Sequence, residues 1–251
     1  MSKPSEKPAH KFPLIQLLPN LVTILAICAG LTAIRFGFEG NYERAVQLVL
    51  AASVLDGLDG KLARLLKSDS KMGAELDSLA DFINFGVAPP LVIYFWALQD
   101  IRSAAWIAVL IFAICSVLRL ARFNVSSKSD TEDDTHGYFT GIPSPAGALL
   151  VMMPMFLSFS IADTPLVPAQ VISLYMIAIG LLLISNIPTW SFKAIIIPRE
   201  RVKFLFIGVV FVGAAVLTFP WITLVGMCLA YAGMVIWALI SGKAPARKKW
   251  F

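Results

Sequence analysis

Four aspartates in the first third of the chain occur as two closely spaced pairs. Asp56 and Asp59 lie three residues apart, and Asp77 and Asp81 lie four residues apart. On a helix, either spacing places both carboxylates of a pair on one face. The stretch between the pairs is polar and basic, as expected for a turn. The spacing therefore predicts a helical hairpin in which four carboxylates face one another.

Clustered carboxylates in or near a bilayer are unfavourable unless a cation neutralises them. One aspartate at the centre of a membrane helix costs about 2.5–3.5 kcal/mol, and like charges add to this cost. Mg²⁺ and Mn²⁺ prefer hard oxygen ligands, and two such cations about 3.5–4 Å apart can hold a phosphate between them. No histidine or cysteine lies nearby, which argues against zinc. We therefore expect two Mg²⁺ or Mn²⁺ ions, with Asp56, Asp59, Asp77 and Asp81 as ligands.

The residues between the aspartates favour a phosphate-containing ligand. Gly57, Gly60 and Ala63 leave the second helix with little side-chain bulk, and Gly73 does the same at the start of the third. Small residues allow a backbone or a flat ligand to approach closely. Arg64, one turn after Gly60, is suited to a bidentate phosphate contact. The alternative, in which the acids only form ion pairs or line a hydrated surface, does not explain this spacing.

The elements that carry these residues are predicted to be membrane helices. The chain is 58% hydrophobic and only 15% charged, whereas soluble domains have about a quarter of their residues charged. Its apolar residues form blocks close to the roughly 20 residues that span a bilayer. We expect an all-α polytopic membrane protein with eight spans, namely Leu18–Phe38, Ala45–Leu65, Met72–Leu98, Ala104–Phe123, Pro145–Ile161, Ala169–Ile187, Val202–Phe219 and Trp221–Ile240.

The basic residues predict the orientation of these spans. They gather at the termini and in the even-numbered connections, whereas the opposite connections hold only Arg44 and Arg102. Because short cytoplasmic loops are enriched in Lys and Arg, both termini and the aspartate hairpin should face the cytoplasm of a prokaryotic inner or plasma membrane. The net charge of +5 then reflects this topology and attraction to anionic lipid, and no nucleic-acid partner is expected.

The aspartate region resembles the signature of the CDP-alcohol phosphotransferases. Every fixed position of that signature is filled by the string Asp56-x2-Asp59-Gly60-x2-Ala63-Arg64-x8-Gly73-x3-Asp77-x3-Asp81. The resemblance implies a six-helix core. We therefore expect the chain to divide into a cytoplasmic segment (1–17), this core (18–190), a basic loop with two further spans (191–240) and a basic cytoplasmic tail (241–251). The resemblance also implies a homodimer.

The resemblance further implies a role for each signature residue. Asp56, Asp59 and Asp77 would bind the metals, and Asp81 would bind metal and act as general base. Gly60, Arg64 and Ser70 would hold the CDP moiety, and Ala63 and Gly73 would give it room. The stretch Pro19-Asn20-x2-Thr23 is similar to a family element beside the nucleotide, although Asn20 and Thr23 are also ordinary helix caps. The implied reaction is attack by an alcohol on the β-phosphorus of a CDP-lipid, with release of CMP.

Two later stretches resemble the phosphatidylserine synthase branch of this family. They are Leu120-Ala121-Arg122-Phe123-Asn124 and Phe139-x-Gly141-x-Pro143-x-Pro145, and Ser191-Phe192-Lys193 is also similar. The branch implies CDP-diacylglycerol and L-serine as substrates, with membrane lipid around the protein.

Serine presents a carboxylate and an ammonium beside its hydroxyl, so its pocket needs a cation and a polar acceptor. Arg119, Arg122 and Lys193 are candidate cations, and Asn124 and Asn84 are candidate amides. The basic residues could instead anchor helix ends among lipid headgroups, and Asn84 could instead form an interhelical hydrogen bond.

Other functions remain open from the sequence. Glycerol 3-phosphate, inositol phosphate or choline could replace serine, although a phosphorylated acceptor would need a denser cluster of basic residues. A cation transporter is an alternative of another class, but transporters commonly contain inverted repeats and we find none. A lipid-binding protein without catalytic activity would not require four acids.

Overall fold

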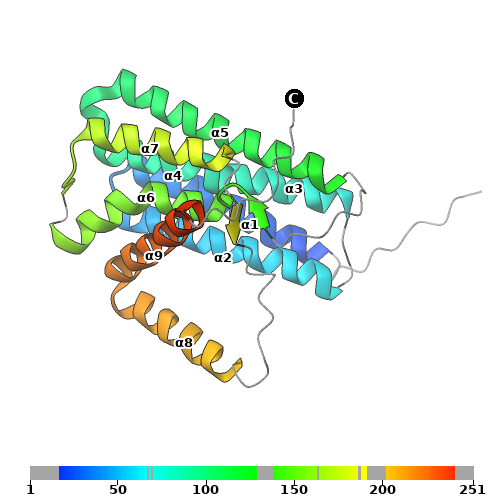
Figure 1. The fold of residues 1–251 in the computed structure, drawn as a ribbon. Coiled ribbons are helices and arrows are strands. Elements are labelled where there is room, and N and C mark those ends of the chain that lie inside the picture. The colour runs from blue at the N-terminus through cyan, green and yellow to red at the C-terminus, as the bar shows by residue number, and fades with distance from the viewer. Residues whose placement is uncertain are drawn as a thin grey trace, which may run out of the picture.

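The computed structural model describes residues 17–66, 68, 70–128, 138–162, 164–185, 188–190 and 202–240. These residues form a helical bundle with one small antiparallel sheet (Figure 1). The elements are α1 (Leu18–Phe38), α2 (Tyr42–Leu66), α3 (Lys71–Asp81), the π-helix η2 (Phe82–Val87), α4 (Ala88–Ala97), the 3₁₀-helix η3 (Gln99–Ile101), α5 (Arg102–Lys128), β1 (Tyr138–Thr140), α6 (Ser144–Ile161), α7 (Ala169–Ile184), β2 (Pro188–Trp190), α8 (Val202–Thr218) and α9 (Pro220–Ile240).

The prediction of an all-α polytopic membrane protein is confirmed, and each of the eight expected spans corresponds to a helical segment. The segments α3, η2 and α4 run on without a break and form the third span, and η3 leads into α5 as the fourth. The fourth span continues to Lys128, five residues beyond its expected end. The sheet was not predicted; it pairs β1 with β2, with Tyr138 opposite Trp190.

Five of the described helical segments are long and apolar enough to cross a membrane. The helices α7 and α8 are apolar but shorter, with 16 and 17 residues. The helix α2 is longer but carries six charged residues. The five segments are Leu18–Phe38, Lys71–Ala97, Gln99–Val125, Ser144–Ile161 and Pro220–Trp237.

Small side chains form the buried face of α1 and large ones face outward. Leu21 and Leu25, for example, are 53% and 57% exposed. This distribution suits lipid, where close backbone approach stabilises helix pairs. The small face packs on α2 and α4, and a Cβ at Gly37 would lie only 3.2 Å from Val92 Cγ2. The residues of this face are Thr23, Ala26, Gly30, Ala33 and Gly37.

Two consecutive prolines account for the π-helix between α3 and α4. Pro89 and Pro90 have no N–H, so they cannot donate to the carbonyls of Phe85 and Gly86 as α-helical residues would. The wider turn of η2 lets the span continue past this gap. Gly86 also lets η2 approach α5 closely, because a Cβ there would lie 2.7 Å from Ser116 Oγ. The irregular turn begins directly after Asp81.

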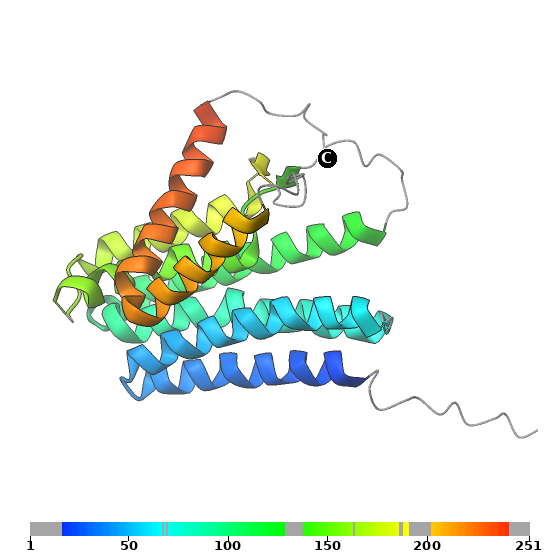
Figure 2. The same ribbon diagram turned by 90° about the horizontal axis from the view of Figure 1, so that it is seen from below.

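The last two helices form a hairpin at the side of the bundle. They run obliquely to the other helices (Figure 1, Figure 2). The helix α9 packs against α6 and β2, whereas α8 packs against α9. Cys228 and Leu224 place α9 in the main buried cluster, together with Met152 and Phe156 of α6. The helix α9 is therefore part of the bundle core.

Candidate active site

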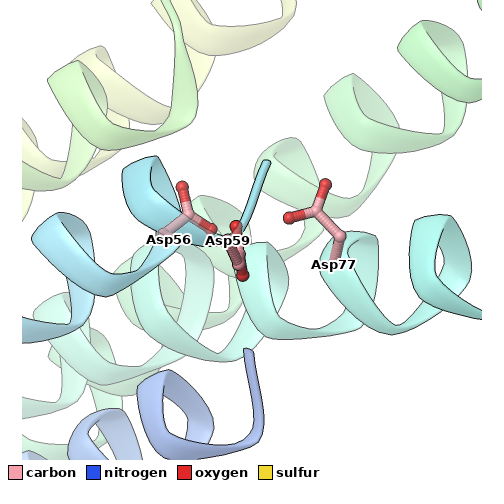
Figure 3. Close-up of side chains that lie close together, drawn as sticks. All are labelled: Asp56, Asp59 and Asp77. Carbon is pink, nitrogen blue, oxygen red and sulfur yellow. The ribbon is translucent and has the colours of Figure 1, made fainter. Parts of the chain in front are cut away.

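The hairpin of α2 and α3 brings three of the four predicted aspartates together. Carboxylate oxygens of Asp56, Asp59 and Asp77 lie within 4.8 Å of one another. Figure 3 shows Asp56 and Asp59 on α2 and Asp77 opposite them on α3. Asp59 is buried, Asp56 is half-buried and Asp77 is exposed. Such a set of oxygens could hold a divalent cation.

Asp81 lies at the edge of this triad. It follows Asp77 by one helical turn, and its side chain is within hydrogen-bonding range of the Asp56 side chain. Asp56 Oδ1 is buried and has no hydrogen-bond donor among the described residues. A buried carboxylate oxygen without a partner is unfavourable, and a cation would supply one. The residues present therefore suit a divalent metal.

Both oxygens of Asp59 are held by neighbouring groups. The Thr23 hydroxyl donates to Oδ2 over 2.7 Å, and the Gly60 N–H donates to Oδ1 over 2.6 Å. Thr23 and Asp59 are each only 3% exposed. Thr23, which the sequence suggested as a neighbour of the nucleotide, therefore also orients a candidate metal ligand.

A pocket of about 350 Å³ opens between α1, α2 and the start of α3. Asp59 and Asp77 form part of its wall, so the pocket and the carboxylate triad are continuous. Pro19, from the stretch expected beside the nucleotide, also lines the pocket, whereas Ser68 and Ala74 were not predicted although both lie inside the signature. All seven residues expected to bind the CDP-lipid line the pocket: Asn20, Thr23, Gly60, Ala63, Arg64, Ser70 and Gly73.

Several pocket residues also have a structural role. Ser70 caps α3, and its Oγ accepts a 2.9 Å hydrogen bond from the Gly73 N–H. A Cβ at Gly73 would lie 3.0 Å from Asn20 Oδ1, so this glycine gives room to α1 as well as to a ligand. Arg64 is exposed, and its Nε donates to the Gly60 carbonyl over 3.0 Å. Gly60 has open space where a Cβ would be.

Arg119 on α5 holds the turn that precedes α6. Its Nε donates to the Ile142 carbonyl and its Nη1 donates to Ser144 Oγ, both over 2.6 Å. Gly141 in this turn has a φ of +86°, and a Cβ there would lie 2.7 Å from the Leu183 carbonyl oxygen. The glycine of the motif from Phe139 to Pro145 is therefore required by the backbone.

The other acceptor candidates have different surroundings. Asn124 Nδ2 donates to Ser78 Oγ over 3.1 Å, which ties α5 to the residue next to Asp77. Ser78 was not predicted, although it lies inside the signature. Asn84 is fully buried, and its amide has no hydrogen-bond partner among the described residues, so the expected interhelical bond is not seen. Arg122 is half-buried on α5, and Lys193 lies outside the described residues.

The fold and the site define a polytopic membrane protein with a carboxylate cluster beside a polar pocket. Residues 16–198 match the family CDP-alcohol phosphatidyltransferase, and residues 200–235 match CDP-alcohol phosphatidyltransferase 2. The chain belongs to the CDP-alcohol phosphatidyltransferase family.

Curated relatives agree with this assignment. A CDP-diacylglycerol–serine O-phosphatidyltransferase of Mycobacterium bovis is 38% identical over 218 residues, which cover 86% of this chain and 76% of the relative. The protein of that name from Helicobacter pylori is 36% identical over 181 residues, or 72% and 75% of the two chains. The Methanocaldococcus jannaschii protein of that name is 33% identical over 219 residues, or 86% and 90%.

Proposed function

We propose that this protein transfers a phosphatidyl group from CDP-diacylglycerol to L-serine, which gives phosphatidylserine and CMP. The relatives that carry the corresponding name support this choice of substrates. The observation that carries the proposal is the continuity of the pocket with the carboxylate triad, because Asp59 and Asp77 belong to both. A nucleotide diphosphate in the pocket would meet the triad through its phosphates.

The chain's own residues account for binding of the CDP moiety. The open space above Gly60 and the small Ala63 leave room for the nucleotide, and Arg64, Ser70 and Asn20 offer polar groups to it. Asp56, Asp59 and Asp77, with Asp81 beside them, would hold one or two Mg²⁺ or Mn²⁺ ions. When bound, these cations would neutralise the diphosphate and the departing CMP.

Asp81 is the residue best placed to act as general base. The serine hydroxyl attacks the β-phosphorus, its O–H proton passes to a carboxylate, and the bond between this phosphorus and the CMP oxygen breaks. Asp81 stands outside the triad but contacts Asp56, so it can accept a proton at the edge of the charged cluster. No covalent intermediate on the protein is needed.

The proposed topology follows from the basic residues between the spans. Both termini and the α2–α3 turn would face the cytoplasm of a prokaryotic inner or plasma membrane, with the pocket open at that interface. The acyl chains of the substrate would then stay in lipid. Residues 18–190 would form the catalytic core, 191–240 the added loop and spans, and the protein would act as a homodimer.

Release of CMP by the purified protein tests the proposal. The assay uses CDP-diacylglycerol, Mg²⁺ or Mn²⁺, and serine, glycerol 3-phosphate, inositol phosphate or choline in turn. We expect CMP release to require both L-serine and metal and to be lost in Asp81→Asn. The control is Asp100→Asn, which changes an exposed aspartate on η3 and should keep CMP release. Release with another acceptor would reject serine and keep the reaction class. No metal-dependent release with any acceptor would reject the enzyme and favour transport or binding.

A further inference from the structure

The helix α3, which carries Asp77 and Asp81, has little buried surface of its own. Among its residues, 71–81, Ala80 alone is buried, whereas three of the six residues of η2 are buried. The π-helix η2 packs against α1, α2, α4, α5 and α6. Because α3 continues into η2 without a break, the packing of η2 determines how far α3 is turned about its axis.

The π-turn also changes the direction in which the aspartates of α3 point. Such a turn holds one residue more than an α-helical turn, so it rotates the helix before it relative to the helix after it by about 100°. If the third span were α-helical throughout and α4 kept its packing, Asp77 and Asp81 would turn away from Asp56 and Asp59. The geometry of the triad therefore depends on η2.

A contact between η2 and α1 holds the π-turn in place. A Cβ at Gly30 would collide with Asn84 Oδ1 and would lie 3.2 Å from Asn84 Cγ. The hydrogen that stands in place of this Cβ therefore points at the amide oxygen, in a weak Cα–H···O contact. A Cβ at Gly86 would likewise lie 2.7 Å from Ser116 Oγ on α5. Close approaches that require glycine thus hold η2 against both α1 and α5.

The Asn84 amide has no second contact that would account for it. Asn84 is fully buried, it does not line the pocket, and its amide has no hydrogen-bond partner among the described residues. Burying an unpaired amide is unfavourable. We propose that Asn84 and Gly30 are positioning residues, which hold the π-turn so that Asp81 faces the carboxylate triad. This inference rests on the proposed function, in which Asp81 accepts the proton of the attacking hydroxyl.

The substitution Gly30→Ala tests the contact, because the added methyl group displaces the Asn84 side chain and turns η2. We expect kcat for serine-dependent CMP release to fall about 10–100-fold, since a displacement of about 1 Å can cost about 100-fold in rate. The rise in Tm that Mn²⁺ causes should also shrink, because Asp77 turns together with Asp81.

The matched control is Gly37→Ala on the same face of α1. A Cβ at Gly37 would lie 3.2 Å from Val92 Cγ2 on α4. This substitution crowds the same helix against the part of the third span that follows the π-turn. It should therefore leave both kcat and the Mn²⁺ response unchanged, even if it lowers the Tm.

Removal of the amide should rescue the crowded variant. In the double variant Gly30→Ala/Asn84→Ala, the added methyl group fills space that the amide has left. Asn84→Ala alone removes only the weak contact and should lower kcat about two- to fivefold. The double variant should recover to the kcat of Asn84→Ala, a non-additivity that shows that the two positions act through each other.

Three results would overturn the positioning role: an unchanged kcat in Gly30→Ala, equal losses in Gly30→Ala and Gly37→Ala, or no recovery in the double variant. If Gly30→Ala does not fold, Asn84→Ala decides, and an unchanged kcat there rejects the role. In each of these cases serine-dependent CMP release by the unaltered protein upholds the proposed function. Absence of that release would reject the proposed function, while the Mn²⁺ response of the Tm still tests the contact.

Discussion

The Thr23 hydroxyl of α1 donates a 2.7 Å hydrogen bond to Oδ2 of Asp59 on α2. Both residues are almost inaccessible to solvent. The bond therefore joins the first helix to the carboxylate triad and limits the orientations that Asp59 can adopt. Groups that orient a metal ligand affect metal affinity although they do not touch the metal.

Loss of this bond should weaken metal binding. Thr23→Val keeps the shape of the side chain and removes the donor, so the metal concentration for half-maximal CMP release should rise about 10–100-fold. The measurement is CMP release as a function of Mn²⁺ or Mg²⁺ concentration at saturating substrates.

The control for this prediction lies on the same helix. Thr32 donates to the Cys28 carbonyl of its own helix over 2.6 Å and lies away from the pocket. Thr32→Val should leave the metal requirement unchanged. If the metal concentration for half-maximal CMP release rose equally in Thr23→Val and Thr32→Val, the cause would be a general change in α1 and not the lost hydrogen bond to Asp59.

Divalent cations should stabilise the folded protein through the triad. A ligand at about 100 times its Kd adds about 2.7 kcal/mol to the free energy of unfolding, so Mg²⁺ or Mn²⁺ should raise the Tm measured in detergent. Asp56→Asn should lose most of this rise and should have a higher Tm than the unaltered protein in EDTA, because it removes one of the clustered like charges. An unchanged metal response in Asp56→Asn would contradict the role of this aspartate.

The sequence predicted those features that depend on local spacing. The separations within the aspartate pairs placed each pair on one face of a helix, and the polar turn between the pairs was enough to bring Asp56, Asp59 and Asp77 to facing helices. The lengths of the apolar blocks predicted the eight helical segments, because about 20 apolar residues in a helix cross a bilayer. The pocket residues on α2 and α3 were located through the signature, and Asn20 and Thr23 through a separate stretch of the first span that resembles a family element.

Features that depend on distant partners were not predicted. Arg119 was expected to contact the acceptor, and nothing near it in the sequence shows that Ile142 and Ser144 accept its hydrogen bonds. The π-helix η2 was not expected within the third span, and its form also depends on its close packing against α5. The helix α9 could not be assigned to the bundle core before its packing against α6 was known.

The turn before α6 should not tolerate a side chain at Gly141. The residue combines a φ of +86° with the Leu183 carbonyl oxygen 2.7 Å from where a Cβ would lie. Gly141→Ala should lower the free energy of unfolding by more than the ~1–2 kcal/mol of the left-handed backbone alone. Gly40→Ala separates the two causes, because Gly40 has a φ of +80° and open space around it. Both variants are compared by chemical unfolding. If Gly141→Ala and Gly40→Ala lower the free energy of unfolding equally, the close contact with the Leu183 carbonyl adds nothing to the loss.

The position of the nucleotide can be tested with two glycines on one helix. Gly57 and Gly60 both have open space where a Cβ would be, but only Gly60 lines the pocket. Alanine at either position should preserve or increase stability, because it favours a helix by about 1 kcal/mol over glycine. If CDP lies over Gly60, Gly60→Ala should raise the KM for CDP-diacylglycerol at least tenfold, a loss comparable to that of one good contact.

Gly57→Ala should leave this KM unchanged and thus serves as the control. The Gly60 N–H that donates to Asp59 is a backbone group, so the substitution does not remove that bond. An equal KM for CDP-diacylglycerol in the two variants would place the nucleotide elsewhere in the pocket. A loss of folding in Gly60→Ala alone would mean that the protein itself, and not its substrate, fills the space above Gly60.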